Sequence, residues 1–204
     1  MDNTGNTTRE KLLYAALDLF SSKGFEATTV DEIAGSVGMK GPNIYNYFKG
    51  KKGLILDLTA MFEDTYKAKM RLEADPAEFI HTAEDLKNFS MEKLRYTVGD
   101  DNIRKLRRIV TIEQFRNEYL SEEATTHQYS NIVGLFTGIM ASLMKKGVVI
   151  QCDPEQLALM YASPVSMLIQ LYDREPERRD EILIKAEAHI DLFIKAFCIK
   201  RNGS

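Results

Sequence analysis

The chain has 204 residues, of which 44% are apolar and 28% are charged, a composition typical of a globular protein with a sizeable core. Cys152 and Cys198 are too few for a disulfide scaffold or a cysteine-ligated zinc site. The N-terminal residues lack the pattern of a signal peptide, and no apolar run is long enough to cross a membrane. We therefore expect a cytoplasmic protein with no membrane partner, no metal and no other cofactor.

The charge is distributed unevenly. The net charge is −3, from 27 Lys and Arg against 30 Asp and Glu. Between Gly38 and Lys52, however, the chain carries Lys40, Lys49, Lys51 and Lys52 and no acidic residue. A local basic patch of this kind is typical of a nucleic-acid contact. Lysine-rich turns are also common as plain solvated surface, so the patch alone leaves both interpretations open.

Three helices are predicted before residue 50. The capping boxes Thr7–Glu10 and Thr29–Glu32 each precede apolar residues at helical spacing. A third helix begins at Gly41-Pro42, because Pro is favoured at the first helical position. The predicted ranges are 8–23, Thr29 to Gly38, and about 42–48. Two short helices joined by a turn that contains Gly are typical of a helix-turn-helix unit.

Six further helices are predicted from apolar periodicity and from Pro and Gly breaks: 51–72, 77–98, 101–117, 120–146, 154–172 and 177–199. The segment Val148–Ile150 favours an extended conformation but has no obvious partner strand. Pro164 is expected to kink its helix. The sequence thus predicts an all-α fold of about nine helices. We expect a helix-turn-helix DNA-binding domain over 1–52 and a larger helical ligand-binding and dimerisation domain over 53–204.

The third helix has the chemistry of a base-reading element. Ile44 and Phe48 share an apolar face, which leaves amides and a phenol on the other side. Asn can bridge the major-groove edge of adenine, whereas hydroxyls, a helix N-terminus and Lys suit phosphates. The candidate DNA contacts are Thr28, Thr29, Lys40, Gly41, Pro42, Asn43, Asn46, Tyr47, Lys49 and Lys51. The alternative is a helix-turn-helix in a fold that does not bind DNA, with Thr29 acting only as a cap.

Four stretches together carry a family resemblance: Ala15–Phe20, Gly24–Val30, Ile33-Ala34 with Gly38, and Ile44–Lys49 with Lys51. Residues 7–53 resemble the DNA-binding domain of the TetR (tetracycline-repressor) family of bacterial transcription regulators. The resemblance implies that Thr29, Lys51 and the two tyrosines Tyr45 and Tyr47 contact phosphates. It therefore adds Tyr45 to the candidate DNA contacts. Asn46-Tyr47 and Pro42 depart from the common family residues, which affects the base preference. A weaker resemblance extends over 104–172.

The resemblance also implies a C-terminal domain that dimerises and holds a small ligand. Helices 154–172 and 177–199 are more apolar than one buried face requires, so we expect them to form a homodimer interface. Burial within a monomer is the alternative. The candidate pocket residues are Met61, Phe62, Tyr66, Phe89, Tyr96, Phe115, Tyr119 and Phe136, with Met70, Met91 and Met140, although such residues are also common in a plain core. Glu113, Gln114, Arg116 and His127 are the polar candidates.

The resulting hypothesis is a homodimeric repressor that binds a palindromic operator and is released by an unknown small-molecule effector. The long helix from Lys51 would act as the lever between the two domains. One alternative is a helical protein–protein adaptor that kept the fold without DNA binding. The other alternative is a helical-bundle enzyme, because Glu78 and His81 have the spacing of half a di-iron motif. The second Glu-x-x-His that a complete di-iron site requires is absent from the sequence. We expect no enzyme.

Overall fold

The computed structural model describes residues 7–69 and 75–199, and these residues form nine α-helices. In chain order the helices are α1 (Thr8–Lys23), α2 (Val30–Ser36), α3 (Gly50–Lys69), α4 (Ala83–Thr97), α5 (Asp101–Glu113), α6 (Glu118–Thr125), α7 (Asn131–Lys145), α8 (Pro154–Arg174) and α9 (Arg179–Phe197). Three short 3₁₀ helices, at Gly41–Asn46, Pro76–Glu78 and Pro176–Arg178, and a π-helical segment at Thr126–Ser130 complete the described helices. The predicted all-α class is confirmed.

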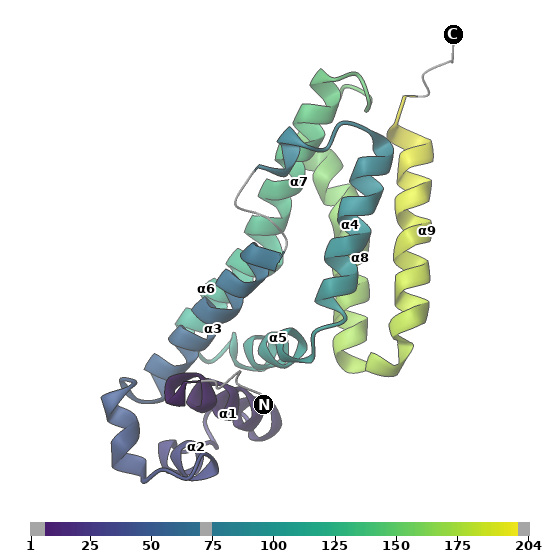
Figure 1. Cartoon of the computed structure of the whole chain (residues 1–204). Helices are drawn as coiled ribbons and strands as arrows, with labels where there is room; N and C mark the ends of the chain where they lie inside the picture. The colour runs from purple at the N-terminus through teal and green to yellow at the C-terminus, as the bar shows by residue number, and fades with distance from the viewer. Residues whose placement is uncertain (1–6, 70–74, 200–204) are drawn as a thin grey trace, which may run out of the picture.

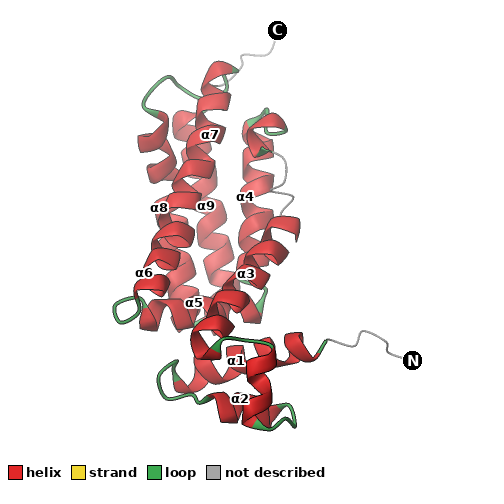
Figure 2. Ribbon diagram, turned by 90° about the vertical axis from the view of Figure 1, so that its left-hand side faces the viewer, coloured by secondary structure: helices red, strands yellow, loops and turns green. Residues whose placement is uncertain are grey.

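The helices form two parts, shown in Figures 1 and 2. We call residues 7–49, which contain α1 and α2, the head, and α4 to α9 the body. Helix α3 rises from the head along one side of the body, and α5 crosses the base of the body directly above the head (Figure 1). None of the described helices has the length and apolar character needed to span a membrane.

The head has a core that continues into the body. Both predicted capping boxes are present, so α1 and α2 begin where the sequence indicates. Their apolar faces bury Leu13, Leu17 and Ile33 together with residues of α3. The same cluster also includes Ile109 of α5 and Leu120 of α6. The base of the body therefore forms one side of the head's core, which couples the positions of the two parts.

The body is centred on Tyr161 of α8, which is almost completely buried. Its ring packs against Phe136 of α7 and Phe193 of α9, with centroids 5.0 and 4.6 Å away. Its hydroxyl shares a 2.7 Å hydrogen bond with Ser90 of α4. A buried hydroxyl needs such a partner, since an unpaired one is destabilising by about 1–3 kcal/mol. One residue thus holds four helices of the body together.

Several predicted boundaries differ from the structure by two to six residues. The third helix is a 3₁₀ helix that ends at Asn46 rather than an α-helix to Phe48. The helix predicted from residue 77 begins at Ala83, because Thr82 and Asp85 form a capping box that the sequence analysis missed. The helix predicted over 101–117 ends at Glu113, since Asn117 caps the next one. The helix predicted over 177–199 runs from Arg179 to Phe197.

The predicted single helix over 120–146 consists of α6, a π-helical segment and α7. The hydrogen-bond pattern changes between them, but the backbone stays helical. Helical dihedral angles persist through the π segment Thr126–Ser130, which joins α6 to α7. Helix α8 likewise continues through Pro164 to Arg174. The extended segment at 148–150 does have a partner: Val149 bridges Cys198, and Ile150 donates to the Phe197 carbonyl at 3.0 Å. The predicted end of the lever helix at Leu72 lies outside the described residues.

Candidate nucleic-acid interface

The exposed side of the 3₁₀ helix Gly41–Asn46, which we call η1, carries the predicted base-reading residues. Ile44 and Phe48 are buried and anchor η1 on the head. Pro42, Asn43 and Asn46 are exposed. Side chains three residues apart eclipse one another in a 3₁₀ helix, so Asn43 and Asn46 lie in one line along η1. The two amides can therefore address neighbouring base pairs from one edge of the helix.

Gly41 packs closely against the side chain of Asp31 in α2, and Lys40 before it is exposed at the start of η1. A Cβ atom at residue 41 would lie 1.5 Å from Oδ1 of Asp31, so a larger residue there would force the exposed Asp31 side chain to move. This packing fixes where the amide line sits relative to α2.

Two tyrosines and two lysines lie within η1 or shortly after it in the chain. The Tyr45 side chain is 63% exposed, and Tyr47 is exposed as well. Lys49 is exposed just beyond η1, whereas Lys51 is half-buried at the start of α3. Exposed phenols and ammonium groups beside a base-reading element are suited to the phosphates that border a groove.

Lys51 has a structural task in addition to its charge. Its Nζ donates to the carbonyls of Phe25 at 2.9 Å and Glu26 at 3.2 Å, and it lies 4.8 Å from the centre of the Phe25 ring. Both carbonyls belong to the loop between α1 and α2. Lys51 therefore ties the start of α3 to that loop and keeps its ammonium group in a fixed position.

Lys51→Ala is expected to lower the stability of the protein as well as its affinity for DNA. Loss of two charge-assisted hydrogen bonds should reduce the free energy of unfolding by about 1–2 kcal/mol. The exposed Lys49 provides a matched control, and Lys49→Ala should change stability by less than about 0.5 kcal/mol. Each variant should lower the salt slope of DNA binding by about 1. Urea denaturation and binding across a salt series measure both quantities, and equal stability of the two variants would contradict this role.

Thr28 and Thr29 have different environments. Thr28 is only 1% exposed, and its hydroxyl donates to the Gly24 carbonyl at 2.8 Å. The prediction that the Thr28 hydroxyl contacts a phosphate is therefore wrong, because this hydroxyl is buried and donates its hydrogen bond within the head. Thr29 is exposed and caps α2, where the carboxylate of Glu32 also accepts from the Thr29 N–H at 2.9 Å. Hydrogen bonds from Lys23 and Thr29 lower the pKa of Glu32 to about 2.

The predicted pocket residues are divided between several places. Phe62 and Met61 belong to the core of the head, and Phe89 and Phe136 to the body. The hydroxyl of Tyr119 shares a 2.6 Å hydrogen bond with Thr59 of α3. Phe115 is 89% exposed, so its assignment to a pocket is wrong. Met70 lies outside the described residues.

Tyr66 of α3 and Tyr96 of α4 are the two predicted pocket residues that the structure brings together across the body, with ring centroids 5.7 Å apart. A separate shallow groove of about 240 Å³ lies between the π segment and α8. Its walls include Tyr129, Ile132 and Met167, and none of the predicted pocket residues lines it.

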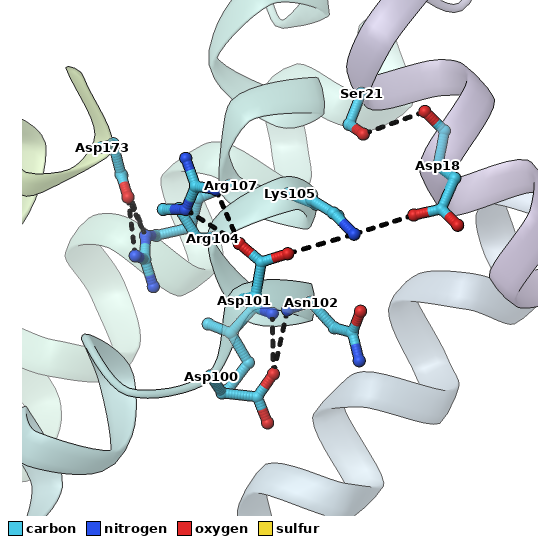
Figure 3. Close-up of polar contacts among 10 residues, drawn as sticks. Asp18, Ser21, Asp100, Asp101, Asn102, Arg104, Lys105, Arg107 and Asp173 are labelled. Atoms are coloured by element: carbon cyan, nitrogen blue, oxygen red, sulfur yellow. Dashed lines mark hydrogen bonds and ion pairs between the residues drawn. The ribbon is translucent and has the colours of Figure 1, made fainter. Parts of the chain in front are cut away.

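One of the polar candidates, Glu113, lies at the joint between body and head. Glu113, at the end of α5, is buried and accepts from the Phe25 N–H at 3.4 Å. Lys105 of α5 also reaches Asp18 of α1 at 2.8 Å (Figure 3). Sequence reasoning missed both contacts, because the partners are 88 and 87 residues apart and no local pattern signals them.

Of the remaining candidates, His127 and Gln114 contact other residues of the protein. His127 lies 3.1 Å from Glu123 and 3.9 Å from Glu63 of α3. Gln114 donates to the Thr111 carbonyl, and Arg116 is exposed. His81, of the half di-iron spacing, receives a hydrogen bond from Lys146 at 2.8 Å. Within residues 7–69 and 75–199, no group of three or more His, Cys, Asp or Glu could hold a metal ion.

Comparison with known proteins agrees with this geometry. Residues 12–58 match the family described as bacterial regulatory proteins, tetR family. A probable HTH-type transcriptional regulator of Bacillus subtilis, YttP, is 35% identical over 104 residues, which is 51% of this chain and 49% of that protein. IcaR of Staphylococcus aureus, a negative transcriptional regulator of the biofilm operon icaADBC, is 41% identical over 46 residues, 22% of this chain and 25% of IcaR. The chain spans about half the length of these curated relatives or less.

Solved structures share the fold over almost the whole chain. SmeT, described as the repressor of the Stenotrophomonas maltophilia multidrug efflux pump SmeDEF, superposes with a TM-score of 0.71 at 19% identity, covering 98% of this chain and 94% of SmeT. A SmeT–triclosan complex gives a TM-score of 0.76 at 20% identity, with 98% and 95% covered. These relatives and neighbours are regulators, in line with the expectation that the chain is not an enzyme. Residues 12–58 therefore match the N-terminal helix-turn-helix domain of the tetR family of bacterial regulatory proteins.

Proposed function

We propose that the chain is a cytoplasmic transcription regulator that works as a homodimeric repressor of a palindromic operator and is released by a small molecule bound in the body. The observation that carries the proposal is the exposed amide line of Asn43 and Asn46 on η1, bordered by exposed tyrosines and lysines. It lies within the stretch that matches the family. The proposed domain division remains 1–52 for DNA binding and 53–204 for ligand binding and dimerisation.

In this proposal two sets of residues have different roles at the DNA. Asn43 and Asn46 read adenines in the major groove, and Pro42 contacts a thymine methyl group. Phosphates are held by Thr29, Lys40, the Gly41 backbone, Tyr45, Tyr47, Lys49 and Lys51. Phosphate contacts fix the register of the protein on the duplex without reading its sequence. The two sets are therefore separable by mutation.

Exposed apolar side chains on α8 and α9 support the homodimer. Met160 and Met167 of α8 and Ile184 and Leu192 of α9 are more than half exposed. Apolar residues at successive exposed positions of two neighbouring helices are typical of a subunit interface. Pairing of α8 and α9 with a second copy would make a four-helix interface with two-fold symmetry. Two heads would then face successive major grooves about 34–36 Å apart.

Helix α3 is suited to carry a signal from body to head. Near the head it is held by the Arg9–Asp57 ion pair at 2.8 Å. Further along, Thr59 and Glu63 contact Tyr119 and His127 of the body. Ligand and DNA would favour different positions of α3, so each must weaken the binding of the other. The SmeT–triclosan complex shows that this fold accepts a small molecule in that protein.

Asn43→Ala is expected to relax the base preference and to weaken binding to the selected operator by about 1–3 kcal/mol. The operator is first obtained by selection from random duplex DNA. Lys49→Ala is the control, and it should weaken operator and scrambled DNA by the same factor, because it contacts a phosphate. Equal losses on both DNAs for Asn43→Ala would remove Asn43 from the base-reading set. Failure of the selection at low salt would favour the adaptor alternative.

A further inference from the structure

A ladder of two tyrosines and two lysines connects α3 to α4. Tyr66 of α3 and Tyr96 of α4 form its centre, with ring centroids 5.7 Å apart. Lys93 of α4 places its Nζ 4.4 Å from the centre of the Tyr66 ring, and Lys69 of α3 lies 4.8 Å from that of Tyr96. The lever helix therefore meets α4 through alternating cations and rings.

Lys93 differs from the other half-buried cations of α4 and α5. Lys87 pairs with Glu187 and Asp191, Arg107 with Asp173, and Lys105 with Asp18 and Asp101. Among residues 7–69 and 75–199, no carboxylate lies within 4.0 Å of the Lys93 ammonium, and its Nζ lies over the Tyr66 ring. A cation withdrawn from water is normally paired, and a ring face replaces only part of the lost hydration.

Burial affects both members of this contact. It lowers the pKa of the Lys93 ammonium to about 8 and raises the pKa of the Tyr66 phenol to about 12. Burial also raises the pKa of Tyr96. At neutral pH, Tyr66 is therefore a protonated hydrogen-bond donor, and most of Lys93 still carries its charge. An anion placed here would gain a cation and hydroxyl donors in a site of low dielectric constant.

We propose that Lys93 and the phenols of Tyr66 and Tyr96 bind the carboxylate group of an organic acid, and that this acid is the effector of the repressor. The inference rests on the proposed function for its regulatory meaning, but the binding site itself does not. The buried Lys93 ammonium can balance the single charge of a carboxylate, and the neutral phenols can donate hydrogen bonds to it.

The position of Lys93 links binding to the lever. A carboxylate that draws the ammonium away from the Tyr66 ring weakens the contact that holds α3 to α4. The end of α3 next to the body would then be free to shift, and α3 carries the head at its other end (Figure 1). The acid would thus favour a spacing of the two heads that differs from the operator spacing.

Binding of a probe panel to the purified protein tests the site without DNA. The probes are octanoate, dodecanoate and cinnamate, each with its methyl ester as the neutral comparator, titrated by calorimetry. At least one acid should bind about 10-fold or more tightly than its ester, a difference of about 1.4 kcal/mol. Lys93→Met, which keeps the length of the side chain, should abolish that preference. Lys69→Met, the exposed lysine of the same ladder, should change it less than about 3-fold.

A second measurement follows Lys93 directly. Carbon-13 NMR of lysine-labelled protein should show the pKa of Lys93 rise when the acid binds, because a carboxylate stabilises the charged ammonium. Absence of acid binding up to about 1 mM, or an acid preference that survives Lys93→Met, would overturn the proposal. Operator binding is assayed separately. If the protein binds operator but no acid, only this inference fails, and if it binds acid but no DNA, only the proposed repressor function fails.

Discussion

Replacing Leu192 with Glu on α9 is expected to convert the proposed dimer into a monomer and to reduce affinity for a palindromic operator by about 10²–10⁴-fold. The Leu192 side chain is 65% exposed, so the substitution should leave the fold of one subunit intact. In a two-fold interface each copy would bury the new carboxylate against apolar residues of the other, and an unpaired buried charge opposes association. Each head would then bind its half-site alone.

Sedimentation of the free protein and titration of the operator measure the two effects of Leu192→Glu. Phe115→Glu is the matched control, because Phe115 is also exposed and apolar but belongs to the loop between α5 and α6 rather than to α8 or α9. It should leave the protein dimeric. A Leu192→Glu protein that remains dimeric and keeps its affinity would show that α9 is not the interface.

The second large effect is expected at the ion pair between Arg107 of α5 and Asp173 of α8. Nε and Nη2 of Arg107 donate to the Asp173 carboxylate at 2.9 and 2.6 Å, and both side chains are more than four-fifths buried (Figure 3). Nη1 also donates to the Thr97 carbonyl at 3.3 Å. Arg107→Met should lower the free energy of unfolding by about 2–4 kcal/mol, because it leaves the Asp173 carboxylate buried without its partner.

A double-mutant cycle with Asp173→Asn tests whether the pair acts as a unit. The double variant should lose less than the sum of the two single variants, since no buried charge remains. Arg178→Met is the control, because Arg178 pairs with Glu175 and Glu181 in a more exposed position. It should lower stability by less than about 1 kcal/mol. Strict additivity in the cycle would mean that the two side chains do not stabilise each other.

The sequence predicted those features that depend on local patterns. The capping boxes at Thr7 and Thr29 place α1 and α2 correctly, because cap and first turn are close in the chain. The spacing of Ile44 and Phe48 correctly predicted the anchored side of η1. The family resemblance rested on the same short-range features, and the match over residues 12–58 confirms it.

Features that depend on contacts between distant residues were missed. From the sequence, Thr28 is expected to expose a second hydroxyl. In the structure this hydroxyl is buried and donates to carbonyls at the end of α1. From the sequence, Phe115 is expected to line a pocket or the core. In the structure α5 ends before Phe115, which is exposed in the loop to α6. The partner of Val149 is Cys198, 49 residues later, and no periodicity indicates that pairing. Tertiary packing determines the burial and the partners of these residues. Local sequence patterns carry no signal for contacts between distant residues.

The most direct test of the repressor account is binding of the purified protein to the DNA upstream of its own gene, followed by fluorescence anisotropy across a salt series. The account predicts saturable binding about 10³-fold tighter than to random DNA, with two protomers on each site. Affinity should fall with salt as the lysines beside η1 release counterions from the phosphates. Absence of binding to both DNAs at low salt would contradict the account, because the exposed amides and lysines of the head would then have no role at DNA.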